Sequence, residues 1–133
     1  IFGIIAHPGQ GTYNAAKFAV RGFTEALWRE LEGTGVTATC VHPGGIKTNI
    51  ARNARMSDKG ALGQDKQTSA DNFDKIARTT SDEAARVILD GVRGNKRRVL
   101  IGADAHVIDA AQRSFPTLYQ KALSIASKFG PKP

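Results

Sequence analysis

The sequence predicts an α/β fold that forms part of a doubly wound parallel sheet with helices on both faces. Three observations predict it: a long helical segment without proline, two short apolar runs rich in β-branched residues, and the alternation of helices and strands along the chain. Parallel strands need cover on both faces and neighbours at their edges, yet only two clear strands are predicted. We therefore expect the sheet to be incomplete within this chain.

The first predicted element is a long helix over residues 12–32, after a turn over residues 1–11. Its apolar residues cover about half of the helix circumference, which is wider than the usual core stripe. Phe18 and Trp28 fall on the otherwise polar side. They predict contact with a second body, either another part of the protein or a symmetric partner, and two singly exposed aromatic residues are the alternative. The predicted core face comprises Ala15, Ala16, Ala19, Val20, Gly22, Phe23, Ala26, Leu27 and Leu31.

The middle of the chain is predicted to hold a buried strand and then a long polar segment. The strand spans residues 36–41 and ends in a turn at Pro43-Gly44. Residues 49–79 show weak periodicity, and a segment of this length inside a compact domain is usually a lid or a binding loop. We expect a substrate lid with short helices of its own, and disorder is the alternative.

The last third of the chain predicts a helix, a strand and a helical tail. Thr80 and Glu83 form a capping box that starts the helix. Residues 99–101 read as a second buried strand, and residues 103–133 as a helical tail broken at Pro116. The predicted inner face of the helix comprises Ala84, Val87, Ile88 and Val92.

The composition is that of a single soluble globular domain, with 41% hydrophobic and 23% charged residues. No stretch approaches the roughly 18 apolar residues that span a bilayer, so no transmembrane segment is expected. The single cysteine, Cys40, lies in an apolar run and predicts a buried thiol in a reducing compartment, hence a cytoplasmic protein. Because the chain starts at Ile1 and its one methionine is Met56, we expect a preceding part of the protein to be missing.

The net charge of +7 could indicate a phosphate-bearing partner, such as a nucleic acid, an anionic membrane or a phosphorylated cofactor. The basic residues are dispersed, however, and the one tight cluster, Lys96-Arg97-Arg98, has no interleaved aromatic residues that could stack on bases. We therefore expect no nucleic-acid partner. The alternative of a basic nucleic-acid binder would predict binding that weakens steeply with salt.

Tyr13 and Lys17 are the candidate catalytic residues. At a spacing of four residues, their side chains lie side by side on one face of the predicted helix. A phenol is a poor base at neutral pH, but a nearby fixed cation favours the phenolate. Such a phenol can exchange a proton with an alcohol or carbonyl oxygen while a hydride moves at the same carbon. The pair alone is also compatible with a structural role, because this spacing is common on helix surfaces.

The residues around this pair resemble a known family. The run Tyr13-Asn14-Ala15-Ala16-Lys17 matches the YxxxK signature of the short-chain dehydrogenases/reductases and opens a long helix, as it does in that family. One helix and one strand later, Pro43-Gly44-Gly45-Ile46-Lys47-Thr48 matches the family's PGxIxT segment. Two motifs in this order are more specific than either alone. The resemblance covers the chain as the C-terminal half of the family's NAD(P)-binding, Rossmann-like domain, and is strongest over residues 1–50.

The resemblance implies an oxidoreductase that transfers a hydride between NAD or NADP and an alcohol/ketone substrate. In that family the tyrosine is the catalytic acid/base, and the lysine assists it and holds the nicotinamide ribose, which assigns these roles to Tyr13 and Lys17. The turn at Pro43-Gly44 would border the nicotinamide, the backbone of Ile46 would bind its carboxamide, and the hydroxyl of Thr48 would contact the cofactor. The end of a strand suits this role, because open α/β sheets bind ligands there.

Several parts of the family's machinery have no match in this chain. The catalytic serine would fall just ahead of Ile1, and the glycine-rich phosphate loop, the residue that distinguishes NAD from NADP and a catalytic asparagine belong to an earlier half. We therefore expect the isolated chain to be inactive and the whole protein to be an enzyme. The alternative is a catalytically incomplete fragment that acts only as a folding or interaction module.

The three histidines do not predict a metal site. His7, His42 and His106 are scattered, without cysteine or carboxylate at ligand spacing, so structural or surface roles are expected. His7 lies between the position of the missing serine and Tyr13, and we expect it to line the substrate pocket. The substrate is taken to be an apolar small molecule, and a homodimer or homotetramer is expected from Phe18, Trp28 and the family resemblance.

Overall fold

The structure, a computed structural model, describes residues 1–54 and 66–129. Its two strands pair in parallel, with Cys40 beside Arg98 and Pro43 beside Ile101, and this confirms the predicted α/β fold class with a parallel, Rossmann-like sheet. The elements in chain order are α1 (Gly11–Glu30), β1 (Cys40–Pro43), α2 (Lys66–Ile76), α3 (Ser81–Arg93), β2 (Arg98–Ile101), α4 (Ala103–Ser114) and α5 (Leu118–Phe129).

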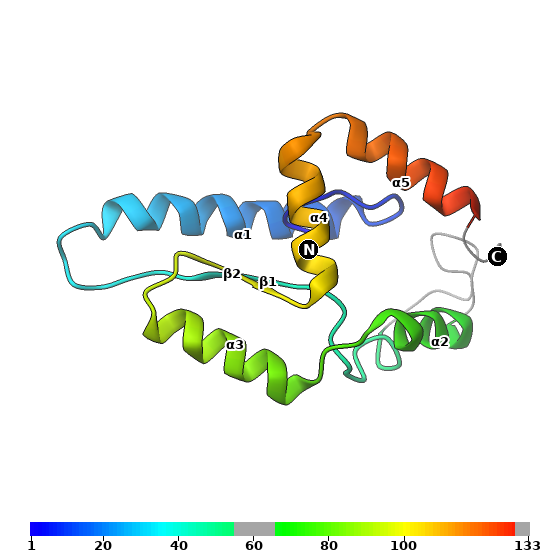
Figure 1. Ribbon diagram of the computed structural model, residues 1–133, viewed down its shortest axis with the longest axis horizontal. Helices are drawn as coiled ribbons and strands as arrows, with labels where there is room; N and C mark the ends of the chain where they lie inside the picture. The colour runs from blue at the N-terminus through cyan, green and yellow to red at the C-terminus, as the bar shows by residue number, and fades with distance from the viewer. Residues whose placement is uncertain (55–65, 130–133) are drawn as a thin grey trace.

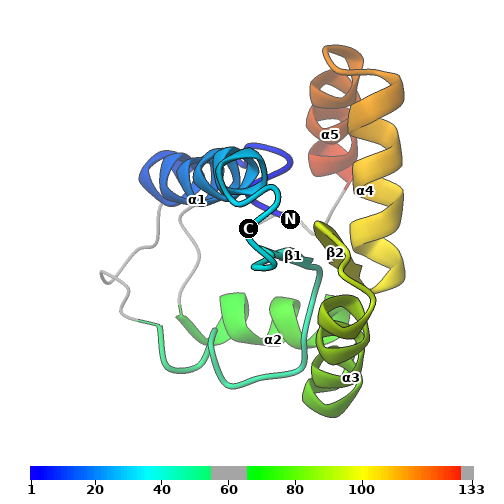
Figure 2. The same ribbon diagram turned by 90° about the vertical axis from the view of Figure 1, so that its left-hand side faces the viewer.

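Helices cover both faces of the small sheet. In Figures 1 and 2, α1 and α4 lie on one face of the β1–β2 pair, and α3 lies on the other. α2 lies near the end of β1, and the N-terminus lies beside β1 under α1. The result is a layered arrangement in which the two strands end at the same edge.

The apolar core lies between the sheet and α3. Val99 and Ile101 of β2 pack against Ala84 of α3. Alternate residues of a strand point to opposite faces, so the other residues of β1 and β2, among them His42 and Arg98, face α1 and α4. The face toward α3 is therefore apolar, whereas the opposite face carries the polar His42 and Arg98 beside Cys40 and Leu100. The partly buried residues that complete the core are Val41, Ile46 and Ile88.

α3 begins as predicted, but its inner face differs from the prediction. The hydroxyl of Thr80 accepts from the Glu83 amide, and the Glu83 carboxylate accepts from the Thr80 amide, which confirms the capping box. The prediction was wrong for Val87 and Val92, which are exposed. Gly91 is buried in their place, because a Cβ there would lie 2.3 Å from a methyl carbon of Val99. The missing side chain lets β2 approach the helix.

The start of α1 turns polar side chains inward, which corrects the sequence prediction for Val20 and Phe23, whereas Leu27 and Leu31 of the predicted face are half-buried. Asn14 is buried and Arg21 is half-buried, whereas Val20 and Phe23 of the predicted core face are 58% and 67% exposed. Polar contacts explain this orientation. Arg21 donates to the Gly3 carbonyl oxygen, which attaches the helix to the preceding turn, and to Glu25 within the helix. Phe18, on the predicted polar side, is 41% exposed.

The first strand is shorter and later than predicted. Val36 is exposed, and β1 begins only at Cys40, whose amide donates to the Arg97 carbonyl oxygen at 2.9 Å. β2 starts at Arg98, so within the part of the chain that the structure describes no strand lies beside the residues before Cys40. Cys40 itself is buried, as predicted.

Within residues 49–79, α2 is the one helix that the structure describes, and part of this predicted lid, residues 55–65, lies outside the described residues. The predicted break in the tail is confirmed, since α4 ends at Ser114 and α5 begins at Leu118. No helix among the described residues is long and apolar enough to cross a membrane.

Ile101 should be a main source of stability, since it is 1% exposed at the centre of the core. We expect Ile101→Ala to lower the free energy of unfolding by about 3 kcal/mol, because the change removes buried methyl groups and leaves a cavity. Urea denaturation of the 133-residue chain measures this. Ile76→Ala, at a 66% exposed isoleucine, is the matched control and should change the unfolding free energy little. Equal losses in the two variants would contradict this placement of the core.

Candidate active site

Tyr13 and Lys17 lie together in the first turns of α1. The Lys17 Nζ atom lies 5.1 Å from the centre of the Tyr13 ring, and Tyr13 is 46% exposed. The phenol is therefore accessible from outside and has a cation at its face, where ring electrons and ammonium attract each other. The predicted side-by-side placement of the two side chains is confirmed.

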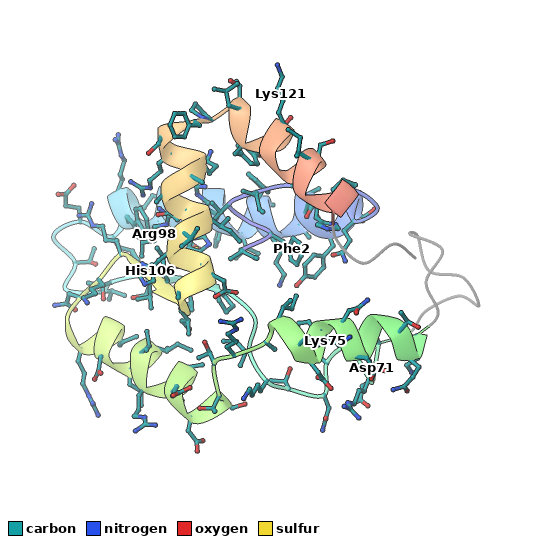
Figure 3. The ribbon with its side chains drawn as sticks, turned by 45° about the vertical axis from the view of Figure 1, so that its right-hand side comes forward. Phe2, Asp71, Lys75, Arg98, His106 and Lys121 are labelled. Carbon is teal, nitrogen blue, oxygen red and sulfur yellow. The ribbon has the colours of Figure 1, made fainter. Side chains whose placement is uncertain are left out.

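An aromatic cluster extends from this pair and was missed by the sequence analysis. The Phe2 ring stands edge-on to the Tyr13 ring, with centres 5.7 Å apart, and edge-on to the His7 ring at 5.9 Å. Figure 3 shows Phe2 beside α1, on the side toward α2. Edge-to-face packing fixes the relative angles of the rings. The sequence signal for Phe2 is its place in the turn over residues 1–11 that leads to Tyr13.

The turn that carries His7 is held against α1 by Asn14. The Asn14 side-chain amide donates to the His7 carbonyl oxygen at 2.9 Å, and its backbone amide donates to the Gln10 carbonyl oxygen at 2.8 Å. Asn14 is 6% exposed, so this hydrogen bond is shielded from water. The start of α1, and with it Tyr13, is thereby fixed to the preceding turn.

Residues 1–5 connect the tyrosine–lysine pair to the end of β1. A Cβ at Gly3 would lie 2.9 Å from the Lys17 carbonyl oxygen, so only glycine allows the turn to pack this closely on α1. The Ile1 nitrogen donates to the Pro43 carbonyl oxygen at 2.8 Å. The structure thus joins Tyr13 and Lys17 to the predicted Pro43-Gly44 turn through one short segment.

The turn that follows β1 is paired with the residue before the capping box. The Thr79 amide donates to the Gly45 carbonyl oxygen at 3.3 Å, and the Lys47 amide donates to the Thr79 carbonyl oxygen at 2.8 Å, forming a parallel bridge opposite Ile46. In such a bridge the amide and carbonyl of the central residue point to the other side. The backbone groups of Ile46 are therefore turned away from Thr79, while its side chain packs on the core.

Thr48 lines an open cavity at the surface, with a volume of about 620 Å³. The guanidinium of Arg52 forms an ion pair with the Asp74 carboxylate of α2 across this cavity, and the Ser81 hydroxyl donates to the Lys47 carbonyl oxygen. The hydroxyl groups of Thr48 and Ser81 and the Lys47 ammonium suit a polar ligand, while the Asp74 carboxylate is paired with Arg52. The lining residues are Lys47, Thr48, Asn49, Arg52, Asp74 and Ser81.

A buried polar layer lies between the sheet and the helices α1 and α4. Arg98 of β2 donates to both carboxylate oxygens of Asp109 on α4, and Arg113 adds an ion pair to the same carboxylate. Figure 3 shows Arg98 beside α4. Because Arg98 and Asp109 are both largely buried, this ion pair joins α4 to the sheet at a defined angle. It also removes Arg98 from the predicted surface cluster of basic residues.

His42 lies in the same polar layer and is 4% exposed, with its Nε2 atom lacking a hydrogen-bond partner in the structure. Burial lowers the pKa of His42 to about 4, and the positive charges of Arg98 and Arg21 act in the same direction, against Asp109. Burial likewise raises the pKa of the neighbouring Cys40 thiol. Both side chains are therefore neutral at pH 7.

Asp104, which the sequence analysis also missed, accepts a hydrogen bond from the Gly45 amide at 2.7 Å. It is the third residue after the end of β2. Polar residues just beyond the ends of neighbouring parallel strands share one edge of the sheet, which is a signal that could have identified it. Within residues 1–54 and 66–129, no group of three or more histidine, cysteine or acidic side chains could hold a metal ion.

Comparisons with known proteins agree on one family. The family model described as short chain dehydrogenase matches residues 1–59. The "Putative oxidoreductase SadH" of Mycobacterium tuberculosis is 47% identical over 98% of this chain and 48% of its own length. The human "Dehydrogenase/reductase SDR family member 9" is 30% identical over 89% of this chain and 35% of its own length. The chain thus spans about half of the first relative and about a third of the second. No solved structure gives a significant match.

The buried histidine should make stability depend on pH. The pKa of His42 is about 4 in the folded chain and 6.5 ordinarily, so the unfolded chain takes up the proton first as the pH falls. The free energy of unfolding therefore keeps its full value above about pH 6.5. It falls as the pH drops toward 4, by about 3 kcal/mol at most. Denaturant unfolding at pH 7 and at pH 4.5 measures this loss, which His42→Gln should diminish. The exposed-site control His106→Gln should keep the wild-type loss, and an unchanged loss in His42→Gln would refute the assignment.

Proposed function

The chain belongs to the short-chain dehydrogenase family, and from this premise we propose that the protein is an NAD(P)-dependent oxidoreductase that interconverts an alcohol and a ketone. One observation carries the proposal: an accessible phenol, Tyr13, with the Lys17 ammonium 5.1 Å from its ring centre. The "oxidoreductase" in the name of the Mycobacterium tuberculosis relative supports the general class of reaction.

The residues present suit a nicotinamide dinucleotide. The backbone groups of Ile46 face away from the bridge to Thr79 and could pair with a carboxamide, which has both a donor and an acceptor. Beyond them, the cavity at Thr48 offers a hydroxyl and the cation of Lys47, which complement ribose hydroxyls and phosphate. Pro43-Gly44 would border the nicotinamide, and Lys17 would hold the adjoining ribose. When bound, such a cofactor supplies or accepts the hydride.

Tyr13 is the proposed acid/base of the reaction. In the direction of oxidation, the Tyr13 phenolate oxygen takes the proton of the substrate hydroxyl while the hydride leaves the carbon that bears it, so the C–O bond becomes a carbonyl. In the reverse direction the phenol gives its proton to the new alkoxide. Lys17 stabilises the phenolate electrostatically, and Phe2 holds the ring at a fixed angle.

The substrate is proposed to lie against the aromatic cluster. Phe2 stands next to the phenol ring and His7 next to Phe2, so the rings form a surface that favours an apolar alcohol or ketone. Residues 49–79 are proposed to close over it as a lid, and the Arg52–Asp74 ion pair joins the start of this segment to α2. Residues 103–133 would form the C-terminal helical part of the same domain.

One observation favours a second candidate, a non-enzymatic interaction module. Val20 and Phe23 of α1 form an exposed apolar surface, which is unusual for a helix without a partner. The same surface would serve a homodimer or homotetramer of the enzyme. Enzymatic activity separates the two candidates, because a pure interaction module would be indifferent to nicotinamide cofactors.

Tyr13→Phe should abolish turnover without abolishing cofactor binding. We would fuse ahead of Ile1 the part of the Mycobacterium tuberculosis relative that precedes the match, and assay NAD- and NADP-dependent oxidation of apolar secondary alcohols. Tyr13→Phe should lower kcat by about a thousandfold, because it removes the group that exchanges the proton. Tyr119→Phe, in α5, is the matched control and should leave kcat unchanged. Near-normal kcat in Tyr13→Phe would rule out the proposed acid/base.

A further inference from the structure

Asp104 joins the two strand ends at the edge of the sheet where the candidate site lies. It stands in the first turn of α4, and its Oδ2 atom accepts from the Gly45 amide, 59 residues away in sequence, at 2.7 Å. A carboxylate that accepts from a backbone amide makes a short, charge-assisted hydrogen bond. The turn after β1 is therefore attached to the start of α4 as well as to Thr79.

The glycines around Asp104 leave the space that its carboxylate fills. A Cβ at Gly44 would lie 2.1 Å from the Asp104 Oδ1 atom, and a Cβ at Gly102 would lie 2.4 Å from it. Gly102 also has φ +91°, a conformation that L side chains rarely adopt. The Asp104 carboxylate thus lies close to the backbone of Gly44 and Gly102. Few side-chain orientations let it reach the Gly45 amide from there.

The hydrogen bonds of Gly45 and Lys47 together fix the orientation of Ile46. Asp104 holds the Gly45 amide on one side of the turn, and Thr79 holds the Gly45 carbonyl and the Lys47 amide on the other. Ile46 lies between these contacts, so the direction of its backbone groups depends on them. Without Asp104, the peptide between Gly44 and Gly45 would lose its described side-chain contact and could rotate.

We propose that Asp104 is a positioning residue for the turn over residues 43–48, here called the cofactor turn. Through its hydrogen bond with the Gly45 amide, Asp104 sets the direction of the Ile46 backbone groups. The inference rests on the proposed function for its consequence, cofactor affinity, but its structural part stands on the Asp104–Gly45 contact alone. Any carboxylate at this place also stabilises α4 through its charge, because a negative charge near a helix N-terminus stabilises the helix. The experiment must therefore distinguish the loss of the Asp104–Gly45 hydrogen bond from the loss of a negative charge near the N-terminus of α4.

Asp82 provides the matched control, because it is an acidic residue in the first turn of α3 for which the structure gives no contact with the turn over residues 43–48. Amide hydrogen exchange of the 133-residue chain, followed by NMR, reports on the Gly45 amide directly. Asp104→Ala should speed Gly45 exchange by about tenfold or more, as expected for loss of a hydrogen bond to a charged group. Asp82→Ala should leave it unchanged. Unchanged Gly45 exchange in Asp104→Ala, or equal acceleration in both variants, would overturn the proposal.

A second variant decides the matter if Asp104→Ala fails to fold. Gly44→Ala places a methyl group where the carboxylate now lies, so it should also speed Gly45 exchange, whereas Gly22→Ala on α1, where a Cβ has no atom within 4 Å, should not. Wild-type exchange of Gly45 in Gly44→Ala would mean that the Asp104 contact does not protect this amide, and would overturn the proposal.

The functional consequence is tested in the longer fused protein. Asp104→Ala should raise the KM for the nicotinamide cofactor by about tenfold with a much smaller change in kcat, because it disturbs binding rather than proton exchange. A fall in kcat alone would overturn the positioning role. If the unsubstituted fused protein shows no NAD(P)-dependent activity, the proposed function fails, and the exchange of Gly45 still decides whether Asp104 holds the turn.

Discussion

β1 and β2 run parallel with Pro43 beside Ile101, and this register brings both chain exits to one edge of the sheet. The chain leaves β1 into the turn over residues 43–48 and leaves β2 through Gly102 into α4. α1 is joined to the same edge through Ile1. The Tyr13 phenol, the turn over residues 43–48 and the Asp104 carboxylate are therefore gathered at this edge. Four residues per strand suffice to position groups that lie far apart in sequence.

The sequence was sufficient to predict those helix boundaries that depend on a few neighbouring residues. The capping box at Thr80 and Glu83 and the helix break at Pro116 depend on chemistry within one turn, and both predictions are confirmed. The orientation of the helices depends on what lies opposite them. Gly91 is buried because Val99 approaches it, and no periodicity of apolar residues could show that.

In the candidate site, too, contacts between neighbouring residues could be predicted, and contacts between distant segments could not. The spacing of Tyr13 and Lys17 was enough to predict their proximity, since a helix places every fourth residue on the same face. Phe2 and Asp104 could not be found in this way, because each acts through a partner in another segment. The inner face of α1 was predicted wrongly for a related reason: the hydrogen bonds of Asn14 and Arg21 join it to the preceding turn, and hydropathy alone does not register directed polar contacts.

The polar face of the sheet restricts how the molecule can adapt. The guanidinium of Arg98 donates to both oxygens of the Asp109 carboxylate, and this pairing has a restricted geometry. α4 is therefore held at a set angle to β2, while on the other face the close approach of Val99 to Gly91 leaves no room for a larger side chain on α3. A laboratory effort to retarget this scaffold to bulkier molecules would do best to vary the ring cluster near Phe2 and leave the ionic layer untouched.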